Sequence, residues 1–490
     1  MKRLVNRRMI LAALASGAGG AAFAGAPLQS LRPAPRKRIP PRRLPDIERM
    51  ISDAGLGGHV AFAVADAGTG EILASRSPLR RMAPASVTKA LTAHYALSHL
   101  GESHRFRTEL IATGPVRDGQ LDGDLVLLGS GDPTLDTDEL GQLAEGLKEA
   151  GIFHVNGVLR VFAGALPRLP WIDGEQPDHV GYNPAIGGLN LNFNRVHFEW
   201  KRAGQSYDVT MQARAREYRP AVGVARMRID EDRRSPVYTY AEAGGVDTWS
   251  VAKSALGSEG ARWLPVRRPA AYCSDVFRTL ARSHGIVLKA GPELDSPVDG
   301  SVLASHSSAP LPDMLRGMLR YSTNLTAEAV GLTASAKGRT PPDSLAASAE
   351  QMNAWLRDAA GVRGAGFVDH SGLGYESRIS PVGMVQALFH TGKAGAVRPL
   401  LREFKTDDAA PEGARVHAKT GTLNFASALG GYLVAPGGRE LVFAILTGDA
   451  DRRDAIPLEQ RERPPGARSW ARRSRALQKR LIGRWADEFA

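Results

Sequence analysis

The sequence predicts an α/β fold, built in α+β layers, whose antiparallel sheet is assembled from both ends of the chain around a large insertion. Near the N-terminus, two strand-like segments at 59–65 and 71–75 flank a Gly-rich turn and indicate a β-hairpin. Near the C-terminus, further strand patterns follow one another at 415–423, 428–434 and 440–447. The stretch from 190 to 300 is rich in strand and turn patterns, which predicts a β-rich insertion.

Helices are predicted between these two groups of strands. The first runs over about 84–99, from a proline suited to a first turn to a glycine past its end. A strand at 124–128 precedes a second helix, which begins at Asp136 or Thr137 and carries an apolar stripe of leucines. Two more helices are expected at 312–319 and 326–335.

The C-terminal segment 467–489 is predicted to be an amphipathic helix. Its apolar residues recur every four positions with arginines between them, at Leu477, Leu481, Trp485 and Phe489. Packing of this stripe against the core is the favoured interpretation, and contact with a membrane surface is the alternative.

The N-terminal 45 residues read as targeting and linker sequence. Residues 1–24 have a basic start, an apolar stretch and an A-x-A cleavage pattern, as in an export signal. Adjacent Arg7 and Arg8 leave twin-arginine and ordinary secretory export both open. We therefore expect a periplasmic protein, soluble or loosely membrane-associated. Residues 25–45 are rich in Pro and Arg, which favours an extended linker, with contact to anionic membrane or wall as the alternative.

The formal charge of +12 is distributed unevenly. Residues 1–45 hold ten basic residues and no acid, and 451–490 hold five more basic than acidic residues, so 46–450 has a net charge of −3. This distribution argues against a nucleic-acid-binding core. A single cysteine, Cys273, excludes an intrachain disulfide and any Cys-rich metal site. No metal or cofactor is expected.

Three short motifs carry candidate chemistry. Ser86 and Lys89 are three residues apart on a predicted helix, which places a hydroxyl and an amine on one face. A serine needs a base to become a nucleophile, and a lysine of lowered pKa can serve. Ser322-Thr323-Asn324 lies between two predicted helices, and Lys419-Thr420-Gly421 lies within a predicted strand. Taken singly, these motifs are equally typical of a solvated helix face, a helix cap and an edge strand.

Together, S-x-x-K, S-x-N and K-T-G in this order are typical of β-lactamases and penicillin-binding proteins. The 232 residues between Lys89 and Ser322 are far more than class A β-lactamases have. Further matching segments are Gly129–Leu135, Leu189–Asn194 and Asp369–Leu373. The sequence thus resembles the serine D-alanyl-D-alanine carboxypeptidases/endopeptidases among the low-molecular-mass class C penicillin-binding proteins.

The resemblance implies a β-lactamase/transpeptidase-like catalytic domain, with an antiparallel sheet flanked by helices, that carries a nested β-rich insertion of two smaller domains. The catalytic domain would comprise residues 46–106 and 310–490, and inserted domain II residues 107–131 and 191–309. Domain III, nested within domain II, would comprise residues 132–190.

The resemblance also implies roles for the motif residues. Ser86 would attack the carbonyl of the penultimate D-Ala, and Lys89 would take its proton. Ser322 would relay a proton to the leaving amine, while Asn324 would order Lys89 and the substrate amide. One departure from the common pattern is Thr323, where Asp or Asn is usual, and it leaves the two outer residues intact.

The remaining implied residues bind substrate. Lys419, Thr420 and the bare backbone of Gly421 would receive the terminal carboxylate of an extended peptide, and the N–H groups of Ser86 and Thr422 would form the oxyanion hole. Asp173 lies in a stretch where relatives carry an acidic residue for the free amino end of diaminopimelate; a surface turn is the alternative.

The expected activity is hydrolysis of peptidoglycan peptides through an acyl-enzyme on Ser86, with β-lactams as covalent inhibitors and no nucleic-acid partner. The sequence does not distinguish carboxypeptidase from DD-endopeptidase activity, because in both reactions the serine attacks the same D-Ala carbonyl. Alternatives are a β-lactamase or esterase on the same fold, and a non-catalytic peptidoglycan-binding or penicillin-sensing protein. The sequence has no recognisable Ω-loop glutamate to drive fast deacylation, which argues against a β-lactamase. The intact motif residues argue against a non-catalytic protein, because binding alone needs no nucleophile–base pair.

Overall fold

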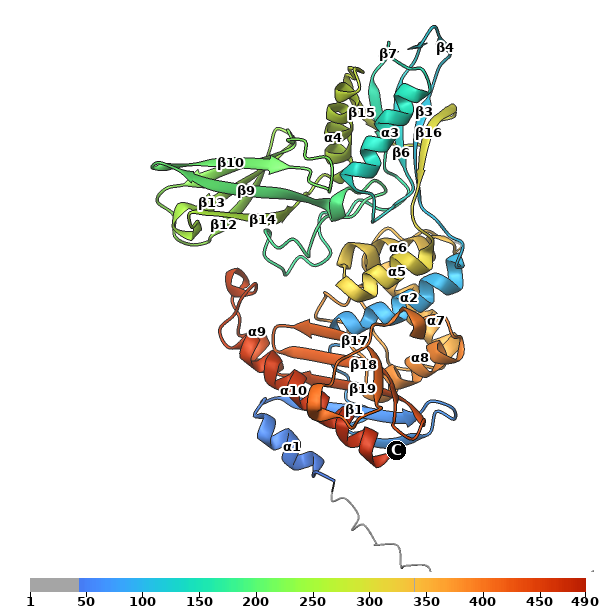
Figure 1. The fold of residues 1–490 in the computed structure, drawn as a ribbon, viewed down its shortest axis with the longest axis vertical. Helices are drawn as coiled ribbons and strands as arrows, with labels where there is room; N and C mark the ends of the chain where they lie inside the picture. Colours follow the sequence, from blue (N-terminus) through green and yellow to red (C-terminus); the bar gives the residue numbers. More distant parts are fainter. Residues whose placement is uncertain (1–43, 339) are drawn as a thin grey trace, which may run out of the picture. The chain divides into compact units, whose positions relative to one another are not determined.

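The computed structural model describes residues 44–338 and 340–490, so the predicted export signal and nearly all of the predicted linker lie outside the described residues. Its central sheet has the order β17-β18-β19-β1-β2, with antiparallel pairing throughout. The strands are β1 (His59–Asp66), β2 (Ile72–Arg76), β17 (Arg415–Leu423), β18 (Ala426–Val434) and β19 (Glu440–Gly448). Because β1 pairs with β19, both ends of the chain build one sheet, as predicted (Figure 1).

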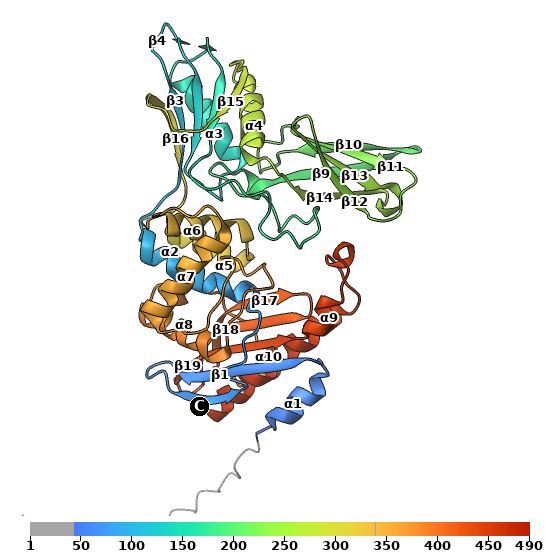
Figure 2. The same ribbon diagram turned by 180° about the vertical axis from the view of Figure 1, so that it is seen from behind.

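Alternate side chains of β1 face two different cores. Phe62 and Val64 pack with Trp485 on one face, whereas Ala61 and Ala63 belong to the cluster on the other face. Successive strand residues point to opposite faces, so a strand covered on both sides is apolar throughout. The helices α1 (Ile47–Ala54) and α10 (Ala467–Glu488) cover the first face, and α2 (Thr88–Leu100) and α8 (Pro381–Lys393) lie on the second (Figures 1 and 2).

The apolar stripe of α10 packs against the sheet. Leu477, Leu481 and Trp485 are at most 1% exposed and share a core cluster with the strands. Of the two interpretations of this helix, core packing is therefore correct for the stripe. No helix in the described part of the chain has the length and apolar character needed to cross a membrane.

Three more helices contribute to the core on the second face, and two of them flank the predicted S-x-N motif. α5 (Leu311–Tyr321) and α6 (Asn324–Ala336) confirm two predicted helices. α7 (Leu345–Ala360) and α8 have no predicted counterpart, although each begins with a serine whose side chain accepts an N–H of the first turn. Shorter helices are η2 (Ala85–Val87), η3 (Asn192–Asn194), η4 (Lys253–Ala255), η5 (Arg398–Leu400), η6 (Asp407–Ala409), α9 (Ala450–Asp454) and η7 (Leu458–Gln460).

The insertion contains a second five-stranded sheet of order β15-β8-β6-β3-β16. Its strands are β3 (Arg107–Ala112), β6 (Leu125–Gly129), β8 (Leu159–Phe162), β15 (Ala290–Leu294) and β16 (Ser301–Ser307). Two helices accompany it, α3 (Thr137–Glu149) and α4 (Pro269–Ser283). Asp136 caps α3 in a capping box with Glu139, which confirms the predicted helix start.

A smaller sheet, β4-β5-β7, and two three-stranded sheets, β10-β9-β14 and β11-β13-β12, complete the insertion. Their strands are β4 (Val116–Arg117), β5 (Gln120–Leu121), β7 (His154–Val155), β9 (Arg195–Ala203), β10 (Ser206–Gln212), β11 (Ala225–Asp230), β12 (Tyr238–Ala243), β13 (Val246–Ala252) and β14 (Glu259–Pro265).

The strand pairing of the insertion crosses the predicted boundary between domains II and III. β8 lies within the segment 132–190 that was assigned to a nested domain III, yet it pairs with β6 and β15, which were assigned to domain II. The physical reason is burial, because Leu159 and Val161 share one core with residues of β3 and β6 and need strand partners on both sides. The segment with sheets of its own is 195–265.

Candidate active site

Ser86 and Lys89 lie where the chain enters the helical layer. Ser86 belongs to η2, and Lys89 is in the first turn of α2. Lys89 Nζ lies 3.0 Å from Ser86 Oγ, as expected for side chains three residues apart on helical backbone. Ala85, directly before the serine, has a φ of +47°, a strained conformation of the kind that clusters at functional sites. The predicted nucleophile and base are therefore in hydrogen-bond contact.

The amine of Lys89 has three oxygen partners. Besides Ser86 Oγ, it contacts Asn324 Oδ1 and the backbone oxygen of Ser371, each at 2.7 Å. Both of these are carbonyl oxygens, which only accept hydrogen bonds. A neutral amine has two N–H groups and one lone pair. When it donates to the two carbonyls, its lone pair is directed at the Ser86 hydroxyl, which is the arrangement that a general base requires.

Burial controls the charge of Lys89. The side chain is 0% exposed, and burial lowers its pKa to about 8, although the charges of Asp369 and Glu328 act in the opposite direction. A large neutral fraction is therefore available slightly above neutral pH.

Two buried carboxyl groups hold the backbone behind Lys89. Glu328 accepts the N–H groups of His370 at 2.9 Å and Ser371 at 2.8 Å, and Asp369 accepts two glycine N–H groups at 2.8 and 2.7 Å. Burial raises the pKa of both carboxyl groups. Sequence reasoning assigned no role to Glu328. The available signal was a glutamate four residues after Asn324, on the face of an otherwise largely apolar helix.

Ser322 and Lys419 form a second hydroxyl–amine pair. Ser322 ends α5 in the left-handed conformation, with a φ of +59°. Lys419 Nζ donates to Ser322 Oγ at 3.0 Å and to Thr420 O at 2.8 Å. Burial lowers the pKa of Lys419 well below its usual value, and the positive charges of Lys89 and Arg402 lower it further. The three predicted motifs thus meet at one place.

β17 is an edge strand of the central sheet. Residues Arg402 and Phe404 bond to the beginning of its outer edge, through Ala418 N–H at 3.2 Å and Val416 O at 2.8 Å. Beyond Ala418, no backbone hydrogen bond to this outer edge is found among residues 44–338 and 340–490. An unpaired strand edge can bind an extended peptide through ladder hydrogen bonds.

Gly421 allows this edge to approach the serine. A Cβ atom at position 421 would lie 2.7 Å from Pro84 O and 2.9 Å from Ser86 N. Real Cβ atoms do not approach backbone so closely, so the position requires glycine. Gly421 thus marks a close approach of two backbone segments, as a glycine inside a strand often does.

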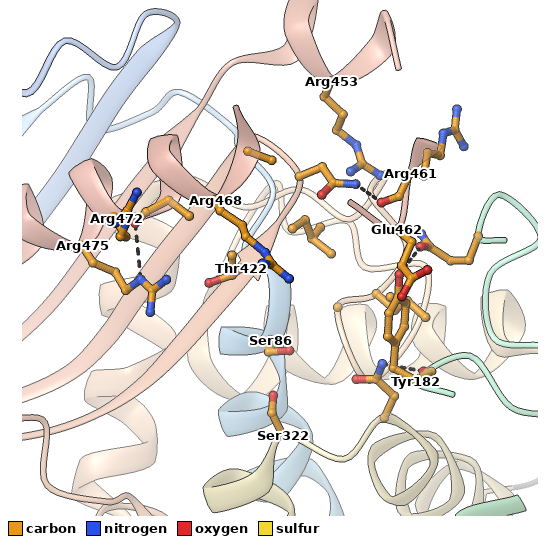
Figure 3. Close-up of a pocket in the computed structure, with 18 residues that line it drawn as sticks. Ser86, Tyr182, Ser322, Thr422, Arg453, Arg461, Glu462, Arg468, Arg472 and Arg475 are labelled. Carbon is orange, nitrogen blue, oxygen red and sulfur yellow. Dashed lines mark hydrogen bonds between the residues drawn. The ribbon is translucent and has the colours of Figure 1, made fainter. Parts of the chain in front are cut away.

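Ser86, Ser322, Asn324 and Thr422 line a cavity of about 790 Å³ (Figure 3), a size within the range of ligand sites. Lys89 and Lys419 are buried at 0% and 3% exposure and are not among its lining residues. Sequence reasoning did not identify the other polar lining residues, which include Gln176, Tyr182, Asn424, Arg453, Arg461, Glu462, Arg468, Arg472 and Arg475.

The insertion contributes one wall of the cavity through the loop 170–183. Tyr182 O accepts the amide N–H of Asn324 at 2.8 Å. Arg461 pairs with Glu175 of this loop at 2.9 Å, and Glu462 accepts from His179 at 2.8 Å. The loop is thereby linked to the S-x-N motif and to the segment before α10.

Asp173 lies in the same loop, one contact behind the cavity. Its carboxylate accepts the N–H of Glu175 at 3.0 Å and Nε2 of Gln176 at 2.8 Å. Gln176 lines the cavity, whereas Asp173 itself is not among the lining residues. The carboxylate is partly exposed, and the positive charge of Arg453 lies within electrostatic range.

Comparison with protein families matches residues 44–462 to the D-Ala-D-Ala carboxypeptidase 3 (S13) family. The chain belongs to this family. Within it, the chain is 30% identical over 447 residues to the D-alanyl-D-alanine carboxypeptidase of Actinomadura sp. (strain R39), covering 82% of this chain and 80% of that protein. It is 25% identical over 439 residues to D-alanyl-D-alanine carboxypeptidase DacB of Haemophilus influenzae, covering 83% of this chain and 90% of the relative.

Solved structures show the same fold. The crystal structure of penicillin binding protein 4 from Haemophilus influenzae superposes with a TM-score of 0.71 at 21% identity, covering 90% of this chain and 100% of that chain. The same protein complexed with a β-lactam gives a TM-score of 0.69 at 20% identity, with the same coverage. This confirms the predicted fold class, a β-lactamase/transpeptidase-like domain with a large insertion.

Proposed function

We propose that Ser86 is the nucleophile of a D-alanyl-D-alanine carboxypeptidase that acts on peptidoglycan peptides. The observation that carries the proposal is the set of partners of Lys89 Nζ, because two obligate acceptors leave the amine lone pair for the Ser86 hydroxyl. A binding protein without chemistry would have no need for a buried, neutralisable lysine in this place. Membership of the S13 family agrees with this role.

In the proposed acylation, Ser86 Oγ attacks the carbonyl carbon of the penultimate D-Ala while its proton moves to Lys89. The N–H groups of Ser86 and Thr422 stabilise the oxyanion that develops; one such donor typically contributes about 10²–10³-fold in rate. The peptide C–N bond then breaks, and the leaving amine takes a proton through Ser322, which Lys419 contacts at 3.0 Å. Water attacks the ester carbonyl, releases the shortened peptide and returns the proton to Ser86.

Lys419 and Thr420 receive the carboxylate of the terminal D-Ala in this proposal. They lie at the start of the unpaired part of the β17 edge, where an extended peptide can continue along the strand. β-Lactams carry a carboxylate and a reactive amide in a similar relation, and one relative is solved in complex with a β-lactam. We therefore propose that β-lactams acylate Ser86.

Slow release of the acyl group distinguishes this enzyme from a β-lactamase. Glu462 is the carboxylate that lines the cavity, and its two oxygens are engaged by Arg262 at 2.9 Å and His179 at 2.8 Å. These bonds lower the pKa of Glu462 to about 2, so it is a poor base for activating water. The proposed acyl-enzyme with a β-lactam consequently persists for minutes or longer.

Release of D-Ala tests the carboxypeptidase proposal. The purified protein is expected to release one equivalent of D-Ala from a peptide that ends in D-Ala-D-Ala, and the Ser86→Ala protein none. Digestion of cross-linked sacculi measures DD-endopeptidase activity in the same way. Absence of both activities in a folded wild-type protein would contradict the proposal.

We also propose that residues 1–24 direct export of the enzyme to the periplasm.

We further propose that Asp173 binds the free amine of diaminopimelate. The bond of Asp173 to Gln176, which lines the cavity, supports contact with a long substrate side chain that enters beside Gln176. Asp173→Asn should weaken cleavage of diaminopimelate peptides by about tenfold, as loss of an ion pair does. A peptide whose side-chain amine is acetylated serves as the control; equal loss for both peptides would refute the role.

A further inference from the structure

The unpaired part of β17 sets the direction of a bound peptide. In the proposed function, the substrate carboxylate lies at Lys419 and Thr420, and the scissile carbonyl lies at Ser86, beside Gly421. The residues before the scissile bond must then continue past Thr422 towards Asn424. At about 3.3 Å per residue in an extended chain, the two residues that precede D-Ala-D-Ala reach the end of the strand.

That end of the cavity is bordered by a row of arginines on α10. Arg468, Arg472 and Arg475 follow one another at i, i+4 and i+7, so they share one face of the helix, and all three line the cavity that contains Ser86. In Figure 3, Arg468 extends towards the Ser86 side of the cavity, and Arg472 and Arg475 lie beyond Thr422. All three are exposed to solvent.

The arginine row lacks the acidic partners that two nearby arginines, Arg461 and Arg262, have. Arg461 pairs with Glu175 and Arg262 with Glu462, each at 2.9 Å. By contrast, no ion pair joins Arg468, Arg472 or Arg475 to a carboxylate within the described ranges. Like charges spaced in this way repel one another on a helix. An anionic ligand that binds at the mouth of the cavity would offset the repulsion between these three positive charges.

The row is also a feature that family membership does not predict. The S13 match ends at residue 462, and all three arginines lie after it. The charge surplus of the segment 451–490 is visible in the sequence, but only the fold directs three of its arginines into the cavity.

We propose that Arg468, Arg472 and Arg475 form an anionic subsite for the acyl side of the substrate. The inference rests on the proposed function for the direction of the peptide. The subsite binds side-chain carboxylates one or two residues before D-Ala-D-Ala. The enzyme consequently prefers acidic stem peptides to peptides whose carboxylates are amidated. The guanidinium groups act by charge-assisted hydrogen bonds and take no part in bond breaking.

Binding to the Ser86→Ala protein tests the subsite without turnover. The probe is a fluorescein-labelled peptide with Glu at both positions before D-Ala-D-Ala, and the matched control peptide has Gln at both. Fluorescence anisotropy should show about tenfold tighter binding of the Glu peptide, with the difference shrinking as NaCl rises from 50 to 500 mM. Arg468→Ala, Arg472→Ala and Arg475→Ala together should remove the preference.

Arg480→Ala is the matched control variant. It lies on the same helix and is exposed, but it faces Asp53 at 3.9 Å and does not line the cavity. Circular dichroism melting of each variant checks that the fold is intact. Equal affinity for both peptides in the parent protein, or equal effects of the triple variant and Arg480→Ala, would overturn the subsite.

Two further outcomes distinguish peptide binding from lipid binding, and the subsite from the proposed function. Tight binding to vesicles of anionic phospholipid, with no preference between the Glu and Gln peptides, would also overturn the proposal, because the row would then serve a lipid surface. Absence of both D-Ala release and DD-endopeptidase activity in the wild-type protein would contradict the proposed function, whereas the anisotropy measured with Ser86→Ala still decides the subsite.

Discussion

Two sets of basic side chains belong to the same site, one buried behind the cavity and one lining it, and their surroundings give them opposite properties. Lys89 and Lys419 are almost completely buried, and burial lowers the pKa of both. Arg468, Arg472 and Arg475 are exposed on α10 and remain charged, because a guanidinium does not lose its proton in proteins. The lysines are thereby suited to transferring protons, and the arginines to binding charge.

Burial and hydrogen-bond partners, more than the sign of the charge, therefore determine the roles of these lysines and arginines. At Lys89, two carbonyl oxygens fix both N–H groups and direct the lone pair at Ser86. At the arginine row, the one printed partner within residues 44–338 and 340–490 is Ala471 O, which Arg475 Nε contacts at 3.3 Å, so most of the guanidinium donors stay available to a ligand. Exchanging arginine and lysine between the two regions therefore separates charge from proton transfer.

The largest effect is expected for Lys89→Arg. This substitution keeps the positive charge but removes the ability to accept a proton, so acylation of Ser86 should fall about 10³-fold or more. Stopped-flow measurement of the second-order rate with a chromogenic cephalosporin checks it. Lys89→Met, which removes the charge as well, should lose as much, and survival of activity in either variant would contradict a base role for Lys89.

The next largest effect is expected for Gly421→Ala, which changes no charge. The added methyl group would approach Pro84 O to 2.7 Å and push β17 away from Ser86. A misplacement of about 1 Å can cost roughly 10²-fold in rate. We expect that loss in D-Ala release, with overpacking costing about 1–3 kcal/mol of unfolding free energy in urea titration. Normal activity of this variant would show that the strand is less close to the serine.

A smaller effect is expected for Glu328→Gln, which alters the pH dependence. Lys89 must be neutral to act, so acylation should rise with pH and level off above its pKa of about 8. The charge of Glu328 opposes the lowering of that pKa by burial, and burial raises the pKa of Glu328 itself to about 8. The two groups therefore titrate together, and removal of Glu328 should move the rising limb to lower pH. Acylation rates from pH 5 to 9 measure the shift. A purely structural role would lower the rate equally at every pH.

The smallest effect is expected for the converse exchange on α10. Replacing Arg468, Arg472 and Arg475 by lysine keeps the three charges in place. The protein should therefore retain at least about a third of its affinity for the Glu peptide, since lysine loses only the forked hydrogen bonds. Anisotropy with the labelled peptide measures this. A loss as large as that of the triple alanine variant would show that shape, and not charge, determines the preference.

The sequence was sufficient to predict the central sheet and the three motifs. Short apolar strand-like runs identified β1 and β19, and the spacing of Ser86 and Lys89 placed two side chains on one helix face. The contact of Asn324 with Lys89 was expected only from the family resemblance, and that of Ser371 was not expected, because these residues come from segments 235 and 282 residues away. A contact over such distances depends on the fold and leaves no local pattern.

Other features that the sequence did not reveal have the same origin. β8 has the length and composition of any short strand, and its two partners lie far apart in the chain, with β6 before it and β15 after it. Its pairing across the predicted boundary at 132–190 therefore left no signal in the sequence. Likewise, the arginines of α10 were counted as a surplus of charge in the C-terminal segment, but only the packing of the opposite face, with Leu477 and Leu481 buried, determines where they point.

Covalent labelling by penicillin tests the central claim, that buried Lys89 makes Ser86 a nucleophile, most directly. Intact-protein mass spectrometry after incubation with benzylpenicillin should show one adduct of the mass of the antibiotic, and peptide mapping should locate it on Ser86. The adduct should persist for minutes and be absent from Ser86→Ala and Lys89→Arg proteins that melt like the wild type. No adduct on the wild-type protein, or an adduct that remains in Ser86→Ala, would contradict the account.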